Sequence, residues 1–212
     1  MRPRRRETKP LKRVIEKRPE LRTVVVFCEG KNSEPDYING LKKLPEVAEN
    51  TALNLELHPE QGVPLTLVQM AVERLEDPEV DECWCIFDVE WPKNHPNLFN
   101  ARQLALAKGV NLVISNPCFE LWLILHHREF AKFATTGEAE SMSRKLDGRA
   151  GKSIDASAYM PLREQAARRA ERLEQRHRQN GTTFPNDNPS SGMHHFLQAL
   201  GQQKGTRRAA ER

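Results

Sequence analysis

Three carboxylates stand directly after two stretches that have the pattern of buried strands. Glu29 follows the β-branched and aromatic run Thr23–Cys28, and Asp88 and Glu90 follow the similar run Cys83–Phe87. Residues two apart on a strand point to the same side, so Asp88 and Glu90 can act together. If the two strands are neighbours in a parallel sheet, the three carboxylates converge at the edge where such sheets bind ligands. Carboxylate oxygens are also the ligands that Mg²⁺ prefers.

The turn after Glu29 has residues that place this carboxylate beside the start of a helix. Gly30 permits a sharp turn with positive φ. Ser33, followed three residues later by Asp36, has the pattern of a capping box that opens a helix. Lys31 lies just past the turn, where it can contact a phosphate or be an ordinary exposed lysine.

A loop rich in proline and asparagine, Trp91–Asn97, follows the acidic pair and cannot comfortably continue a strand or a helix. We expect it to lie over the carboxylates and to close over a substrate. Lys93 and His95 within it can contact phosphate or shuttle a proton. A simple connecting role stays open for both residues.

A further apolar segment places another carboxylate at the same edge. Asn116 suits a helix N-cap and Pro117 the first helical position, which predicts a helix over Pro117–His127. Glu120 and His127 lie seven residues apart, on one face of this helix. Because a buried carboxylate needs a partner, we expect His127 or a backbone amine to contact Glu120. Asn116 and Glu120 are therefore predicted at the edge of the site.

Strands and helices alternate from residue 23 to about residue 130. This alternation predicts an α/β, Rossmann-like sandwich with a mostly parallel four-stranded sheet and a helical C-terminal extension. The strands are expected at 23–28, 52–58, 83–87 and 110–115, and a helix over 98–108 is expected to end at Gly109. The expected organisation is a basic flexible arm at 1–22, an α/β core at 23–130, a helical extension packed on the core at 131–200 and a flexible tail at 201–212.

The composition is typical of a soluble protein. The 212 residues carry a net charge of +4, and no apolar run reaches the length of a bilayer span. The amino terminus has no apolar region of a secretory signal, so the cytoplasm is the expected location and no membrane partner is expected. The four cysteines, Cys28, Cys83, Cys85 and Cys118, fall in or beside predicted buried segments, which favours reduced core thiols.

Basic residues gather in the flanks of the predicted core. Residues 1–22 hold ten Lys or Arg and three Glu, and residues 161–180 hold six Arg and three Glu. Four arginines share one face of a predicted helix, where they are expected to contact nucleic-acid phosphates: Arg168, Arg169, Arg172 and Arg176. For the two termini, solvated disordered tails are the alternative interpretation.

The chain resembles the RloB family, whose members look like Toprim-fold proteins associated with bacterial antiphage and restriction loci. The matching stretches are VVVFCEGKNSEPDYINGL, CWCIFDVEWP, VNLVISNPCFELWLILHH and, more loosely, NPSSGMHHFLQAL. By this resemblance Glu29 corresponds to the Toprim glutamate, and Asp88 with Glu90 to the Toprim acidic pair. That pair is usually Asp-x-Asp, so Glu90 departs from it by a longer side chain.

The resemblance implies a Mg²⁺-dependent nuclease, with Mn²⁺ as an alternative ion. Asp88 and Glu90 are the expected metal ligands, and Glu29 the general acid/base or an additional ligand. The resemblance further implies the effector of an antiphage, abortive-infection system that works with a separately encoded ABC-type ATPase. The ATPase is expected to be a separate protein because this chain has no complete nucleotide-binding loop: its segment GRAGKS at 148–153 lacks the preceding strand and the glycine spacing of such a loop.

A second interpretation keeps the fold without the catalysis. In this interpretation the chain is a nucleic-acid- or partner-binding module, and the departure at Glu90 favours it. The sequence leaves open whether the nucleic acid is DNA, tRNA or another RNA, how activity is triggered and what the oligomeric state is.

Overall fold

A computed structural model describes residues 21–57 and 63–201, so the predicted basic arm lies outside the described residues except for its last two positions, and the predicted tail except for Gly201. The elements, in chain order, are β1 (Arg22–Cys28), α1 (Ser33–Lys42), α2 (Pro45–Ala48), β2 (Thr51–Leu57), α3 (Pro64–Arg74), β3 (Glu82–Asp88), α4 (Leu98–Lys108), β4 (Asn111–Asn116), α5 (Glu120–His127), α6 (Thr136–Asp147), α7 (Ala156–Tyr159), the 3-10 turn η1 (Met160–Leu162), α8 (Arg163–Gln179), β5 (Ser190–Ser191) and α9 (Met193–Leu200).

The sheet is mixed and mostly parallel. Its order is β2-β1-β3-β4-β5, and the first four of these strands run parallel to one another. The α/β prediction is confirmed, but the count of four strands is wrong, because the described residues also contain β5, which pairs antiparallel with the end of β4. A strand of two serines is too short and too polar to leave a periodic signal in a sequence.

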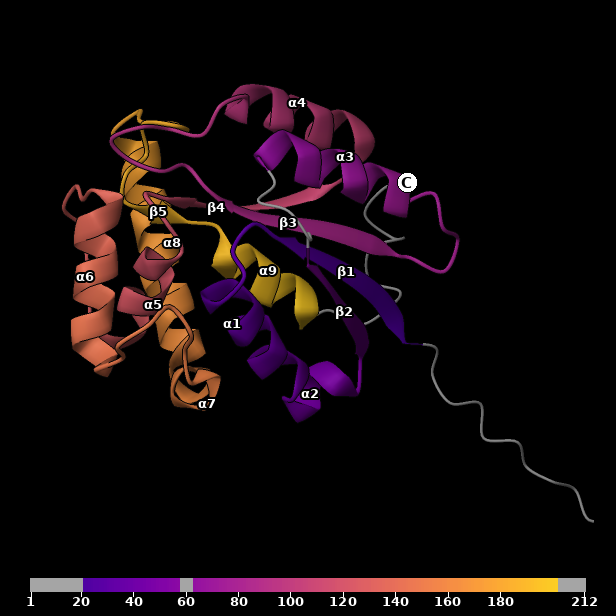
Figure 1. The fold of residues 1–212 in the computed structure, drawn as a ribbon, viewed down its shortest axis with the longest axis horizontal. Coiled ribbons are helices and arrows are strands. Elements are labelled where there is room, and N and C mark those ends of the chain that lie inside the picture. Colours follow the sequence, from indigo (N-terminus) through magenta and orange to yellow (C-terminus); the bar gives the residue numbers. More distant parts are fainter. Residues whose placement is uncertain (1–20, 58–62, 202–212) are drawn as a thin grey trace, which may run out of the picture.

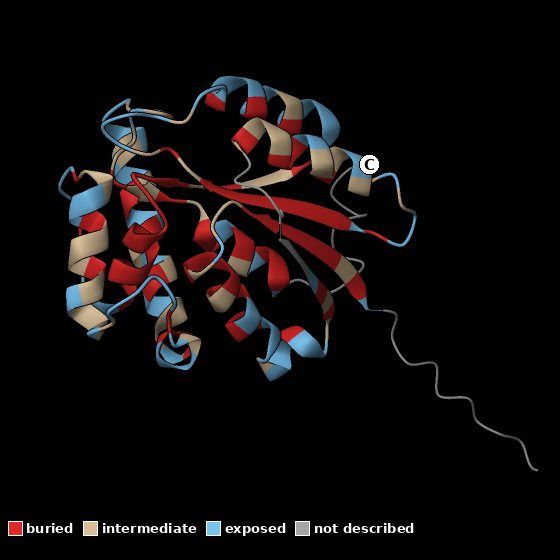
Figure 2. Ribbon diagram, viewed as in Figure 1, coloured by how far each residue is buried: buried red, intermediate tan, exposed pale blue. Residues whose placement is uncertain are grey.

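Helices cover both faces of the sheet, which makes three layers (Figure 1). Alternate β1 residues point to opposite faces: Val25 and Phe27 pack with α3 and α4, whereas Val24 and Val26 pack in the larger core with α1, α5, α8 and α9. The strands are therefore buried on both sides, and the exposed residues of α3 and α4 face away from the sheet (Figure 2).

Helix ends are predictable from the sequence where a residue is needed for its backbone conformation. Helix α4 ends at Lys108 because Gly109 adopts φ +74° and takes the chain into the left-handed region, as predicted. Side-chain caps were less predictable. Asn32, not Ser33, is the N-cap of α1, and the predicted capping box is wrong because Ser33 and Asp36 hydrogen-bond instead to distant groups: Ser33 Oγ donates to Glu120, and Asp36 Oδ2 accepts from the Ile154 amide.

Asn116 also departs from its prediction. It is the last residue of β4 rather than an N-cap, and the helix that follows begins at Glu120. The Asn116 side-chain amide donates to the Pro185 carbonyl at 2.9 Å and to Asp187 Oδ1 at 3.0 Å, which ties β4 to the segment before β5. The tertiary contact thus replaces the local cap.

The four cysteines all lie within the described residues, where they are buried and form no disulfide with one another, as expected of core thiols. None of the described helices combines the length and the apolar character that crossing a membrane requires.

Candidate active site

An acidic pocket lies at the carboxyl edge of the parallel strands, between this edge and helices α5 and α6. Its cavity has a volume of about 480 Å³. Among the described residues, six carboxylates line it: Glu29, Glu34, Asp88, Glu90, Glu120 and Glu140. The structure thus brings the three predicted catalytic residues, Glu29, Asp88 and Glu90, to one cavity.

Strand pairing places Glu29 next to Asp88. Strands β1 and β3 are neighbours, with Cys28 opposite Ile86, and the Glu29 amide donates to the Ile86 carbonyl at 3.1 Å. The Asp88 amide in turn points to Glu29 Oε2 at 3.4 Å. Two chain segments 59 residues apart are therefore fixed to each other by the sheet itself.

Glu90 reaches the pocket by a different route from the one predicted. Strand β3 ends at Asp88, and Glu90 adopts φ +67°, so strand alternation does not orient it. Its amide donates to the Pro117 carbonyl at 2.8 Å, and its own carbonyl accepts from the Asn94 side-chain amide at 2.7 Å. Left-handed backbone is uncommon for a residue with a Cβ, and these two hydrogen bonds hold it.

The loop after Glu90 supplies a histidine to the site. His95 Nε2 lies 2.7 Å from Glu29 Oε1, and both side chains are partly buried. The hydrogen bond with Glu29 raises the pKa of His95; burial opposes this, and the negative charges of Glu29 and Glu90 add to it. Glu29 and His95 therefore form a pair that can hold a proton at neutral pH.

Asp88 is the carboxylate whose environment most favours a cation. Its Oδ1 is buried and has no hydrogen-bond partner among the residues that the structure describes. Burial, followed by the charges of Glu34, Glu29, Glu120 and Glu90, raises the pKa of Asp88 well above its usual range. An ion bound here would satisfy the oxygen and relieve the repulsion between the carboxylates.

Glu34, on the first turn of α1, is a site residue that the sequence reasoning missed. It is 7% exposed. Burial raises its pKa to about 7, against hydrogen bonds to backbone amides that lower it, with Glu120 and Glu29 adding to the rise. Its carboxylate also occupies the space where a Cβ on Gly30 would lie, so a side chain at position 30 would require this carboxylate to move. Gly30 is not among the described glycines with positive φ, so the turn does not use that freedom.

We expect Glu34→Gln to stabilise the metal-free protein at alkaline pH. A carboxyl with a raised folded-state pKa stabilises the fold fully below its unfolded pKa and loses this contribution as the pH rises through its folded pKa, here between about 4.5 and about 7. The variant should gain about 3 kcal/mol in unfolding free energy at pH 8, relative to the wild type, and show a flatter pH profile in urea melts. Glu76→Gln, an exposed control on the turn after α3, should follow the wild type. If the unfolding free energy of Glu34→Gln depends on pH as that of the wild type does, the pKa of Glu34 is not raised.

Glu120 does not pair with His127. Its Oε1 accepts from Ser33 Oγ at 3.2 Å and lies 3.9 Å from the Arg149 guanidinium, whereas His127 is exposed. Arg149 belongs to the loop at 148–153, which turns back toward the pocket after α6. Lys152, from the same loop, lines the pocket and lies 3.5 Å from Glu140. No local sequence pattern predicts this return, because only the fold brings the loop to the sheet edge.

A comparison with protein-family models matches the RloB-like protein family over residues 24–200. This chain belongs to that family. The match begins in β1 and ends at the last residue of α9, so it includes every residue of the acidic pocket. Comparisons with curated proteins and with solved structures gave no match.

The predicted phosphate-contacting residues of this RloB-like chain lie in different places. Lys31 is exposed and lines the pocket, whereas Lys93 is exposed on the loop and is not among the described lining residues. Arg169 donates to the carbonyls of Leu125 and His126, which caps the end of α5.

The other three predicted arginines, Arg168, Arg172 and Arg176, are exposed. Arg172 pairs with Glu129 at 2.6 Å, and Arg176 donates to the Ala131 carbonyl at 3.0 Å. Arg168 lies on the side of α8 near α9, beside Gln198. Of the four arginines, Arg169 thus has the clearest structural role in this family member.

Proposed function

We propose that this RloB-like protein is a Mg²⁺-dependent nuclease that hydrolyses phosphodiesters of DNA or RNA, as the effector of a bacterial antiphage system with a separate ABC-type ATPase. The observation that carries the proposal is the buried Asp88 Oδ1, which has no hydrogen-bond partner within the described part of the chain and lies among crowded carboxylates at the edge of a parallel sheet. The resemblance of the Glu29 turn and the Asp88-Val89-Glu90 motif to Toprim proteins supports the choice of phosphodiester chemistry. The defence role and the ATPase partner follow from the family alone.

The donor set fits a magnesium ion bound by few protein ligands. Among the described residues, the carboxylate oxygens of Glu29, Asp88 and Glu90 do not all lie within 4.8 Å of one another. Mg²⁺ typically binds one or two carboxylates together with water and substrate phosphate oxygens. We assign Asp88 and Glu90 as its ligands, with Glu29 as the additional candidate. The bound ion would neutralise phosphate charge and polarise the phosphorus for attack.

Glu29 is the residue that we propose to take a proton in hydrolysis. Water attacks phosphorus, a phosphorus–oxygen bond breaks, and one proton leaves the water while another reaches the departing oxygen. Glu29, hydrogen-bonded to His95, can accept the first proton, and the departing oxygen, on the opposite side of phosphorus, takes the second from solvent water. Lys31 and Lys152 line the same pocket and can contact the phosphate.

The direct test is a cleavage assay on the purified full chain. It should cut labelled single-stranded DNA, double-stranded DNA or total tRNA in Mg²⁺ or Mn²⁺, and EDTA should stop the cleavage. The assay is run with and without a separately encoded ABC-type ATPase, because the family resemblance implies such a partner. Binding of nucleic acid with no cleavage in any arm would favour a non-catalytic binding module, the alternative that Glu90 in place of the usual aspartate suggests.

Nucleic-acid affinity should depend strongly on salt. If about four to six phosphates are engaged, raising salt from about 50 to 200 mM should weaken binding by two to three orders of magnitude. Replacing Arg168, Arg172 and Arg176 by glutamine should flatten this dependence, since each lost phosphate contact removes about 0.9 from the slope. Arg169 is left in place because it caps α5. Fluorescence anisotropy measures the slope, and a variant with the wild-type slope would assign these three arginines to solubility or to an acidic protein partner.

A further inference from the structure

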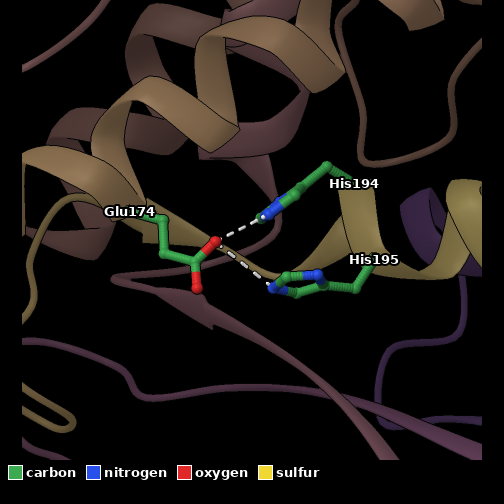
Figure 3. A group of neighbouring side chains, drawn as sticks. All are labelled: Glu174, His194 and His195. Carbon is green, nitrogen blue, oxygen red and sulfur yellow. Dashed lines mark hydrogen bonds and ion pairs between the residues drawn. The ribbon is translucent and has the colours of Figure 1, made fainter. Parts of the chain in front are cut away.

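A second group of ligand-type side chains lies away from the acidic pocket, where helix α8 packs on α9. Glu174 of α8 faces His194 and His195, the second and third residues of α9 (Figure 3). Glu174 Oε2 lies 3.0 Å from His194 Nε2 and 3.4 Å from His195 Nε2. Among the described residues, this is the group of three whose candidate ligand atoms all lie within 4.8 Å of one another. None of the three lines the acidic pocket.

The contacts of His194 leave its Nε2 facing a carboxylate oxygen without a hydrogen between the two atoms when the ring is neutral. His194 Nδ1 lies 3.0 Å from the Ser191 carbonyl oxygen, which only accepts, so Nδ1 carries a hydrogen. In a neutral imidazole Nε2 is then an acceptor, and it faces a carboxylate oxygen, another acceptor, in a side chain that is 3% exposed. Either a second proton on the ring or a shared metal ion satisfies both atoms. An N–H donated to a backbone carbonyl is also the usual way in which a metal-bound histidine is oriented.

We propose that Glu174, His194 and His195 bind a divalent transition-metal ion, with zinc as the ion that best matches the ligands. Two imidazoles and a carboxylate are a common zinc ligand set, whereas Mg²⁺ takes oxygen ligands. Ligand atoms about 2.0 to 2.1 Å from a tetrahedral zinc lie about 3.3 Å from one another, close to the two separations from Glu174 Oε2. The existing side-chain positions thus need little movement to hold the ion.

Neighbouring contacts pre-arrange this site. Arg178 Nη2 lies 3.1 Å from the other oxygen of Glu174, Oε1, which leaves Oε2 directed at the histidines. The His195 side chain is 50% exposed, so an ion can enter from solvent and keep a water as its fourth ligand. The bound ion would join α8 to α9 directly after β5, whose Ser191 pairs with β4. We therefore assign the site a structural role in fixing the C-terminal helix, independent of the proposed nuclease chemistry.

The test is zinc binding by the full chain after dialysis against a chelator. Titration of Zn²⁺ against a chromophoric competitor should show one tight site that His195→Ala weakens by at least about tenfold. His195→Ala removes a half-exposed side chain and should fold; Glu174→Gln, which keeps the volume, is the second variant. Zinc at about a hundred times its Kd should raise the Tm of the wild type by about 5 °C or more, and that of His195→Ala much less. Cobalt substitution should give the visible absorption of a tetrahedral site.

Two control variants decide which residues bind the ion. His127→Ala removes an exposed histidine of α5 and should retain the wild-type zinc affinity. Asp88→Asn should also retain it, because Asp88 belongs to the other pocket. Unchanged zinc affinity in both His195→Ala and Glu174→Gln, or loss of the tight site in Asp88→Asn, would overturn the proposal. Neither result depends on whether the protein cleaves nucleic acid.

Discussion

Asp88→Asn should reduce Mg²⁺-dependent cleavage at least about a hundredfold while the protein stays folded. A metal ion acting as a Lewis acid contributes several kcal/mol to transition-state stabilisation, and each 1.4 kcal/mol is a factor of ten in rate. The substitution removes the charge that faces the pocket but keeps the volume of the side chain, so it creates no cavity. Cleavage of the preferred substrate at saturating Mg²⁺ is the measurement.

Stability measurements separate a metal ligand from a structural residue. The pKa of Asp88 is raised by burial and by the surrounding carboxylates, so its ionisation opposes folding once the pH exceeds the unfolded pKa of about 3.9. Without metal, Asp88→Asn should therefore be at least as stable as the wild type at pH 7. Adding Mg²⁺ should raise the Tm of the wild type and not that of the variant. Glu76→Gln, which removes an exposed carboxylate, should match the wild type in both assays. A sharp loss of stability in Asp88→Asn would make this residue structural.

The sequence predicted the elements whose formation depends on local patterns. Continuous apolar runs gave β1 and β3, and the glycine after Lys108 gave the end of α4, because both reflect burial or backbone conformation that neighbouring residues determine. The order of the carboxylates along the chain then sufficed to predict that Glu29 and Asp88 meet, since parallel strands end at one edge.

What the sequence could not predict depends on contacts between distant segments. Ser33 has the pattern of a cap but binds Glu120 instead, 87 residues away. The loop that carries Arg149 has no periodicity, so nothing local shows that it returns to the site. Glu34 could have been suspected from one feature of the sequence: it lies in the first turn of the predicted helix, directly after the turn that carries Glu29. Its burial among other acids became apparent only when the helices were in place.

Arg149 is the buried cation that offsets part of this acidic charge. Its side chain is 10% exposed, pairs with Asp147, and donates to Ser143 Oγ at 2.9 Å, with Glu120 3.9 Å away. Burial alone would raise the pKa of Asp147, but hydrogen bonds from Tyr159 and Arg149, together with the Arg149 charge, hold that pKa below its usual range. Loss of the guanidinium would leave Asp147 and Glu120 without this positive charge, in a region with little access to water.

Arg149→Met should therefore lower the free energy of unfolding by about 3 kcal/mol or more at pH 7, since removing one partner of a buried ion pair leaves the other charge uncompensated. Arg172→Met is the matched control: Arg172 also pairs with a glutamate, Glu129, but is 55% exposed, and such pairs contribute less than about 1 kcal/mol. Urea unfolding of both variants gives the comparison. The difference should shrink as the pH falls below about 3.8 and through the lowered folded-state pKa of Asp147, because protonation then removes the charge that Arg149 stabilises. Equal losses in the two variants would show that the buried charges around Arg149 are already compensated by solvent.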